Sequence, residues 1–196
     1  MPEFVLMSLA CVARHWGRND VAALLVLGYS AFLRTMELLS LRRWQLQFAT
    51  DGFSLVIALP LTKGGLRRHA KEAVVLRDPR VISFLRVLKA HLAPDAVLQQ
   101  GTVPEFRALF KQLVASLGVA RLQMQPYSLR RGGATMHYRR FQNMGLALQM
   151  GRWADSSVAR IYIAEGVEQL LANSFTEDEM ARFASLASGL DFDVRG

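Results

Sequence analysis

The feature that most constrains the fold is a mostly apolar run from Val21 to Phe32. A membrane-spanning helix needs roughly 20 such residues, about twice what this run provides. Asn19 and Asp20 precede the run and Arg34 follows it, so polar residues mark both of its ends. The run therefore predicts a helix buried inside a globular core.

Length and composition indicate one globular unit inside the cell. The chain has 196 residues, of which 52% are hydrophobic, enough to bury a full core in one domain. Cys11 is the only cysteine, which excludes an internal disulfide and a cysteine-rich zinc site. The N-terminus lacks the pattern of a secretory signal, so we expect a protein of the cytoplasm, nucleoid or nucleus that is not secreted.

The charge of the chain indicates a polyanionic partner. Lys and Arg number 24 against 16 Asp and Glu, a formal net charge of +8. Basic charge alone does not separate a nucleic acid from a membrane surface. Most of the excess is Arg, whose planar guanidinium can grip a phosphate bidentately, which favours phosphate recognition.

Periodicity predicts helices on both sides of a short stretch of strands. We expect early helices over Phe4–Trp16, Asn19–Ser30 with Asn19 as N-cap, and Thr35–Leu41. We expect later helices over Pro79–Leu92, Val103–Leu117, Ser128–Phe141, Met144–Gly151 and Val158–Leu171. A last helix begins at Thr176, which forms a capping box with Glu179.

A change of period to aromatic and β-branched residues predicts the strands. We expect them over Trp44–Thr50, Phe53–Leu59 and Ala70–Leu76. Asp51-Gly52 separates the first two and is the strongest hairpin signal in the chain. The predicted fold class is therefore mainly α with a small three-stranded antiparallel β-sheet.

Two segments place an arginine at the start of a helix. Arg34 precedes an amphipathic helix in which Glu37 follows three positions later. Arg130 lies in the first turn of another helix, shortly before the glycine pair Gly132 and Gly133. Glycines disfavour helix, so a pair inside one suits close approach of another helix or of a DNA backbone.

A third segment, residues 151–162, leads through a polar loop into a short helix that carries Tyr162. In this order the three segments resemble the tyrosine recombinase (phage integrase) family. The boxes of that family read Arg-x-x-Glu-Leu-x-x-Leu, then His-x-x-Arg, then Gly-His or Gly-Trp nine residues before a tyrosine. The matching residues, with the family's β-hairpin lysine included, are Arg34, Lys63, Arg130, Trp153 and Tyr162, and Tyr127 stands at the position of the His.

The resemblance covers about Asn19 to Tyr162 and implies the catalytic-domain fold of that family, with DNA recombination or integration, as in mobile elements, as its activity. It implies that Tyr162 attacks a DNA phosphodiester and forms a 3′-phosphotyrosine ester. The attack adds negative charge to the phosphate oxygens. The sequence offers no residue cluster with metal-ligand spacing, so Arg34 and Arg130 would supply the cations, with no cofactor and no metal.

The resemblance implies supporting roles for further residues. Lys63 would give a proton to the leaving 5′ oxygen, and Trp153 would pack on the site and donate its indole N–H to a phosphate oxygen. We interpret Glu37 as a residue that fixes its helix by pairing with a basic group. Arg67, Arg68 and Arg131 are expected to bind DNA.

Two positions depart from the family pattern. Tyr127 stands where the family usually has His, and a phenol with a pKa near 10 is a poor proton shuttle at neutral pH. Arg152 stands where Gly usually precedes Trp153. The hypothesis of a catalytically inactive relative that only binds DNA therefore stays open, as does a type IB topoisomerase-like relaxing enzyme.

The resemblance also implies how the chain is organised. We expect residues 1–196 to be one catalytic domain without the family's amino-terminal DNA-clamping domain. Residues 174–196 would form a C-terminal helix and tail able to exchange between subunits. The expected partners are double-stranded DNA and further copies of the chain, as a dimer or tetramer on DNA, and not a membrane.

Overall fold

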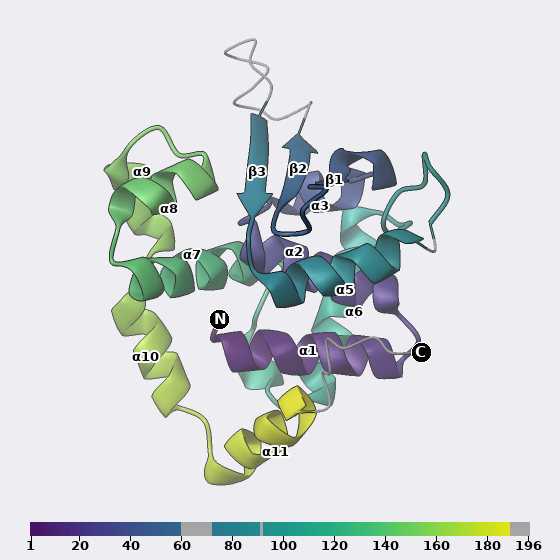
Figure 1. The fold of residues 1–196 in the computed structure, drawn as a ribbon. Coiled ribbons are helices and arrows are strands. Elements are labelled where there is room, and N and C mark those ends of the chain that lie inside the picture. Colours follow the sequence, from purple (N-terminus) through teal and green to yellow (C-terminus); the bar gives the residue numbers. More distant parts are fainter. Residues whose placement is uncertain (60–71, 91, 189–196) are drawn as a thin grey trace.

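The computed structural model describes residues 1–59, 72–90 and 92–188, and these are mainly helical (Figure 1). The N-terminal half contains α1 (Glu3–His15), α2 (Asn19–Ser30), α3 (Thr35–Ser40), η1 (Arg43–Gln45), β1 (Leu46–Phe48), β2 (Leu55–Leu59), β3 (Glu72–Leu76) and α5 (Pro79–Ala90). The C-terminal half contains α6 (Val103–Ser116), η2 (Ala120–Leu122), α7 (Tyr127–Phe141), α8 (Met144–Gly151), α9 (Ser156–Tyr162), α10 (Glu165–Asn173) and α11 (Glu177–Ser188). The predicted fold class is confirmed.

Helix α2 is the centre of the molecule. Its residues from Val21 to Tyr29 are all buried, and α1, α3, α5 and α7 pack around it. The prediction of a buried helix is therefore confirmed. The prediction of Asn19 as N-cap is wrong, because Asn19 is the first helical residue and Arg18 is the N-cap. The Arg18 guanidinium pairs with Asp20 at 2.9 and 2.7 Å across this start.

The three strands form one antiparallel sheet in the order β1-β2-β3. Leu46 faces Ile57 across the first pair, and Leu55 faces Leu76 across the second. Gly52 has a positive φ of 78° in the first turn, which confirms the hairpin at Asp51-Gly52.

The first strand is shorter than predicted, because a 3-10 turn takes the place of its beginning. The buried Gln45 side chain accepts a hydrogen bond from the Arg42 N–H at 2.9 Å and donates one to the Ala58 carbonyl at 2.7 Å. These bonds favour the turn over a longer strand. The predicted start of the third strand, at Ala70, lies outside the described residues.

The single helix predicted over Val158–Leu171 is wrong, since the chain forms α9 and α10 with a break between them. Ile163 is extended, with φ −86° and ψ 102°, and Ala164 also leaves the helical region. The break lets Ile163 pack against a small second hydrophobic cluster. The buried members of this cluster are Phe32, Ala134, Trp153 and Ala159.

The last helix, α11, lies along α1 at the other end of the molecule from the sheet (Figure 1). Phe183 is buried there against Phe4, with ring centroids 5.3 Å apart. The predicted capping box is confirmed, with Thr176 N–H to Glu179 Oε2 at 3.0 Å and Glu179 N–H to Thr176 Oγ1 at 3.2 Å. Exchange of residues 174–196 between subunits stays a prediction.

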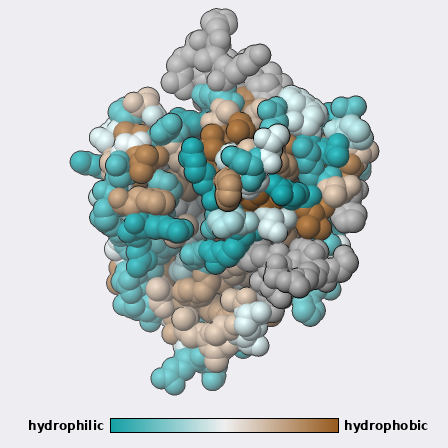
Figure 2. Space-filling view, viewed as in Figure 1, coloured by the Kyte–Doolittle hydropathy of each residue, from teal (hydrophilic) through white to brown (hydrophobic). Residues whose placement is uncertain are grey.

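Hydrophilic and hydrophobic side chains are interspersed over the face seen in Figure 2. Within residues 1–59, 72–90 and 92–188, no helix has the length and apolarity needed to cross a bilayer.

The glycine pair of α7 lies where this helix crosses α2. A Cβ atom added at Gly133 would overlap the Tyr29 carbonyl, and one added at Gly132 would overlap the Met1 carbonyl and the Tyr29 ring. The pair is therefore explained by close helix approach, one of the two reasons that the sequence suggested.

We predict that Gly133→Ala lowers the free energy of unfolding by at least about 1–3 kcal/mol. The added methyl group meets the Tyr29 carbonyl, and a backbone group cannot move aside as a side chain can. Urea denaturation followed by circular dichroism measures this loss. The control is Gly166→Ala, at a helical position with no atom within 4 Å of the added Cβ. It should be neutral or stabilise by up to about 1 kcal/mol. Equal stability of the two variants would contradict the packing described.

Candidate active site

Arg130 is the buried centre of the candidate site. It lies in the first turn of α7, and its side chain is fully buried. One terminal nitrogen donates to the Phe32 carbonyl and the other to the Gly151 carbonyl at 2.8 Å. Its Cζ lies 5.1 Å from the Trp153 ring and 5.2 Å from the Tyr162 ring, within cation–π range.

The environment of Arg130 disfavours its charge without removing it. Burial, followed by the positive charges of Arg34 and Arg152, lowers the pKa of Arg130 to about 10, while Glu37 and Tyr162 oppose this shift. This pKa still lies well above neutral pH. Arg130 therefore stays a cation, in a place where an added anion would be favoured.

Tyr162 is the last residue of α9 and is partly exposed. Asp155 caps the start of this helix, its Oδ1 accepting from the Val158 N–H at 3.1 Å. The Tyr162 ring stacks on Trp153, with centroids 4.7 Å apart and planes 27° from parallel. The fold therefore brings Tyr162 and Trp153, from the segment of residues 151–162, together with Arg130 of α7.

Tyr127 lies at the edge of this cluster and is 46% exposed. Its ring centroid is 5.6 Å from that of Tyr162. Partial burial, followed by the hydrogen bond and charge of the Tyr162 phenol, raises the pKa of Tyr127 to about 12. Tyr127 is thus a neutral phenol at pH 7, able to hydrogen-bond but not suited to act as a base.

Arg34 joins the site through a network of ion pairs. Its Nη1 contacts Glu37 Oε1 at 2.6 Å, and its backbone N–H donates to Glu37 Oε2 at 2.8 Å. Glu37 also pairs with Arg152 at 2.7 Å, and Arg152 lies 3.5 Å from Glu72 at the start of β3. The prediction that Glu37 pairs with a basic residue is confirmed.

Sequence reasoning missed the role of Arg152. Its backbone is left-handed, with φ 55° and ψ 42°, a conformation that glycine adopts most easily. Its side chain is only 5% exposed and connects α3 to β3 through the two carboxylates. An arginine at a position that usually holds glycine was the available signal.

Two N–H groups around the Arg130 guanidinium have no hydrogen-bond acceptor within the described residues. Arg130 Nε and Trp153 Nε1 are buried and lack a hydrogen-bond partner within the described residues. Unpaired buried donors are costly, so a ligand oxygen that reaches them would be bound favourably.

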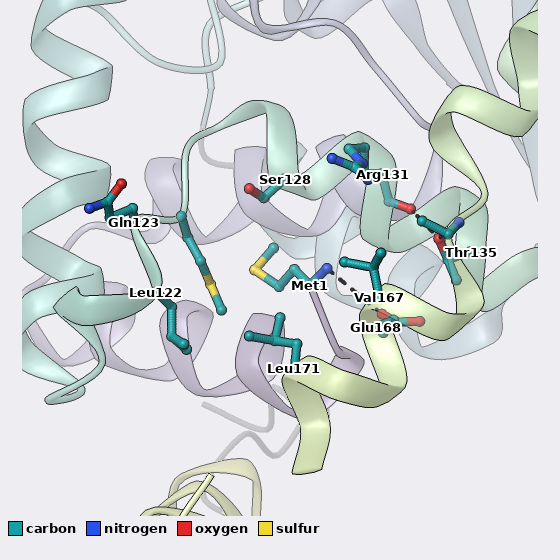
Figure 3. Close-up of a pocket in the computed structure, with 11 residues that line it drawn as sticks. Met1, Leu122, Gln123, Ser128, Arg131, Thr135, Val167, Glu168 and Leu171 are labelled. Atoms are coloured by element: carbon teal, nitrogen blue, oxygen red, sulfur yellow. Dashed lines mark hydrogen bonds and ion pairs between the residues drawn. The ribbon is translucent and has the colours of Figure 1, made fainter. Parts of the chain in front are cut away.

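The remaining candidate residues are Lys63, Arg67, Arg68 and Arg131. Lys63, Arg67 and Arg68 lie outside the described residues. Arg131 lines a pocket between α7 and α10 together with Glu168 (Figure 3). A DNA-binding role for these residues stays a prediction.

Comparison with solved structures shows that the chain has the catalytic-domain fold of the tyrosine recombinases. The post-cleavage complex of the XerH site-specific recombinase with palindromic difH has a TM-score of 0.65 and 17% identity over 88% of this chain. The XerH pre-cleavage complex with difH gives 0.65 and 18% over 89%. The XerA recombinase gives 0.64 and 14% over 94%.

The chain spans 52% of the XerH chains and 63% of the XerA chain. No protein-family model matches the sequence, and no curated protein matches it. The fold implied by the resemblance is confirmed, whereas the roles of individual residues stay predictions.

We predict that Glu37→Ala destabilises the fold by about 3–5 kcal/mol, because it leaves the buried Arg152 cation short of its closer carboxylate. Chemical denaturation at pH 7 measures the loss. The control is Arg80→Ala, which removes the 3.4 Å ion pair of the exposed Arg80 with Asp78 and keeps the hydrogen bond from the backbone N–H at position 80 to Asp78. That change should cost under about 1 kcal/mol. A loss at Glu37 no larger than at Arg80 would contradict the network.

Proposed function

We propose that this chain is the catalytic domain of a DNA strand transferase that breaks and rejoins DNA through a 3′-phosphotyrosine ester on Tyr162. The observation that carries the proposal is the stacking of Tyr162 beside the buried Arg130 cation, 5.2 Å from the ring, in a recombinase fold. A nucleophile beside a preorganised cation is what attack on a phosphodiester needs.

Arg130 and Arg34 would stabilise the charge that develops when the tyrosine oxygen attacks phosphorus. The two unpaired donors, Arg130 Nε and Trp153 Nε1, are further candidates to contact phosphate oxygens. Loss of one such arginine is expected to slow cleavage by about 10³-fold, by analogy with arginine fingers in phosphoryl transfer.

The site must open before chemistry can occur. Arg130 is fully buried under the rings of Trp153 and Tyr162, so a phosphate can reach its guanidinium only after a ring moves. Movement of the Tyr162 ring would expose the cation and free the phenol in one step. DNA binding would favour this open state, since the phosphate takes over the contacts of the cation.

In the reaction, a bond forms between the Tyr162 oxygen and phosphorus while the bond from phosphorus to the 5′ oxygen breaks. Lys63, outside the described residues, would give the leaving oxygen its proton. Tyr127, with its high pKa, would hydrogen-bond the phosphate, and the proton of the Tyr162 phenol would pass to water at this partly exposed position. The ester keeps the bond energy, so a DNA hydroxyl can reverse the step and rejoin the strands.

The proposed partner is double-stranded DNA, bound by further copies of the chain as a dimer or tetramer. Support comes from the net charge of +8 and from the fold shared with the DNA-bound XerH recombinase. Binding should weaken steeply with salt, because cations of the protein replace counterions on the phosphates.

A second candidate function is DNA binding without cleavage. One observation favours it: Tyr127, a phenol with a raised pKa, lies 5.6 Å from Tyr162 between ring centroids, at the position where the family usually has His. The same experiment separates the two functions.

We predict that the protein forms a covalent, denaturant-stable adduct with nicked duplex DNA carrying a sequence selected from a random library. Tyr162→Phe should abolish the adduct, because it removes the nucleophilic oxygen. Tyr138→Phe is the matched control, because Tyr138 lies on α7 and is not one of the rings stacked at the site. This variant should still form the adduct. Denaturing gels with labelled DNA measure the adduct.

An adduct that persists in Tyr162→Phe would overturn the assignment of the nucleophile. Salt-sensitive binding of the selected DNA with no adduct from the unaltered protein would favour the second function instead.

A further inference from the structure

Thr135 contacts the backbone on both sides of the break that follows Tyr162. It lies on α7, the helix that carries Arg130, and is buried. Its hydroxyl oxygen is 3.2 Å from the Tyr162 carbonyl oxygen and 3.2 Å from the Ala164 nitrogen. Figure 3 shows Thr135 beside the start of α10, on the helix that also carries Arg131.

The hydroxyl suits both backbone groups. It accepts a hydrogen bond from the Ala164 N–H and has one hydrogen of its own to donate. That hydrogen can go to the Tyr162 carbonyl or to the Arg131 carbonyl, 2.9 Å away in its own helix. Because α9 ends at Tyr162, its last carbonyls need partners outside the helix, and Thr135 offers one.

Apolar burial around this break is limited. Ile161, Val167 and Leu170 are 66%, 61% and 72% exposed. Ala159 is the buried residue of α9, and Glu168 that of α10. The Tyr162 ring stacks on Trp153, and Glu168 forms a 3.7 Å ion pair with Arg139 of α7. The hydrogen bonds of Thr135 add a direct connection between α7 and the backbone of the break itself.

We propose that Thr135 is a positioning residue for Tyr162. Its hydroxyl fixes the backbone at the end of α9 relative to α7, the helix that carries Arg130, and so aligns the phenol with the guanidinium. The inference rests on the proposed function of Tyr162 and adds to it a residue that does not touch the reacting atoms. A misplacement of about 1 Å can lower a reaction rate by roughly a hundredfold, so such a residue can matter.

The test compares Thr135→Val, which keeps the shape but loses the hydroxyl, with Thr135→Ser, which keeps the hydroxyl. We expect Val to slow single-turnover adduct formation by roughly ten- to a hundredfold. The DNA dissociation constant should change less than about twofold, because Thr135 is buried. Ser should restore the rate to within about threefold. All assays run at a temperature where thermal unfolding shows both variants to be folded.

A second readout does not depend on cleavage. 3-Fluorotyrosine placed at position 162 reports the surroundings of the ring by ¹⁹F NMR. Thr135→Val should shift or broaden this signal, whereas Thr135→Ser should leave it near that of the unaltered protein.

An unchanged rate and an unchanged ¹⁹F signal in folded Thr135→Val would overturn the proposal. Failure of folded Thr135→Ser to rescue would also overturn it, because the methyl group and not the hydroxyl would then be responsible. A ¹⁹F change in a protein that never forms an adduct would support the positioning of Tyr162 while refuting its proposed function.

Discussion

The buried guanidinium of Arg130 requires partners for its charge, and both halves of the fold supply them. A cation removed from water is costly unless it is hydrogen-bonded and close to opposing charge or polarisable rings. The carbonyls of Phe32 and Gly151 accept from it, and the rings of Trp153 and Tyr162 lie against it. These contacts fix where α2, α8 and α9 meet α7, and they bring the candidate nucleophile to the cation.

The second constraint is the balance of charge around this cation. Arg34, Arg130 and Arg152 gather near Glu37 and Glu72, so three positive groups meet two negative ones. Glu37 keeps Arg34 and Arg152 in place. The remaining positive charge is what a site for a phosphate diester should have before its ligand arrives. The pairing thus serves stability and the proposed chemistry together.

Much of this arrangement could be predicted from the sequence. The apolar run from Val21 to Phe32 predicted the central helix, and the ordered boxes predicted that Arg130 and Tyr162 belong to one site. The break at Ile163 could not be predicted, because local helical periodicity continues through it and only tertiary contacts interrupt the helix. The ion pairs of Arg152 were equally hidden, since they join distant segments, and the pair with Glu37 spans 115 positions.

The central claim is that Tyr162 becomes covalently linked to DNA, and the most direct measurement is the identity of the linked residue. Peptide mass spectrometry of the adduct, after nuclease trimming of the DNA, locates the nucleotide on one of the four tyrosines, Tyr29, Tyr127, Tyr138 or Tyr162. The account predicts a nucleotide on the peptide that contains Tyr162 and on no other. A nucleotide on Tyr127, the exposed neighbour in the same cluster, would contradict it.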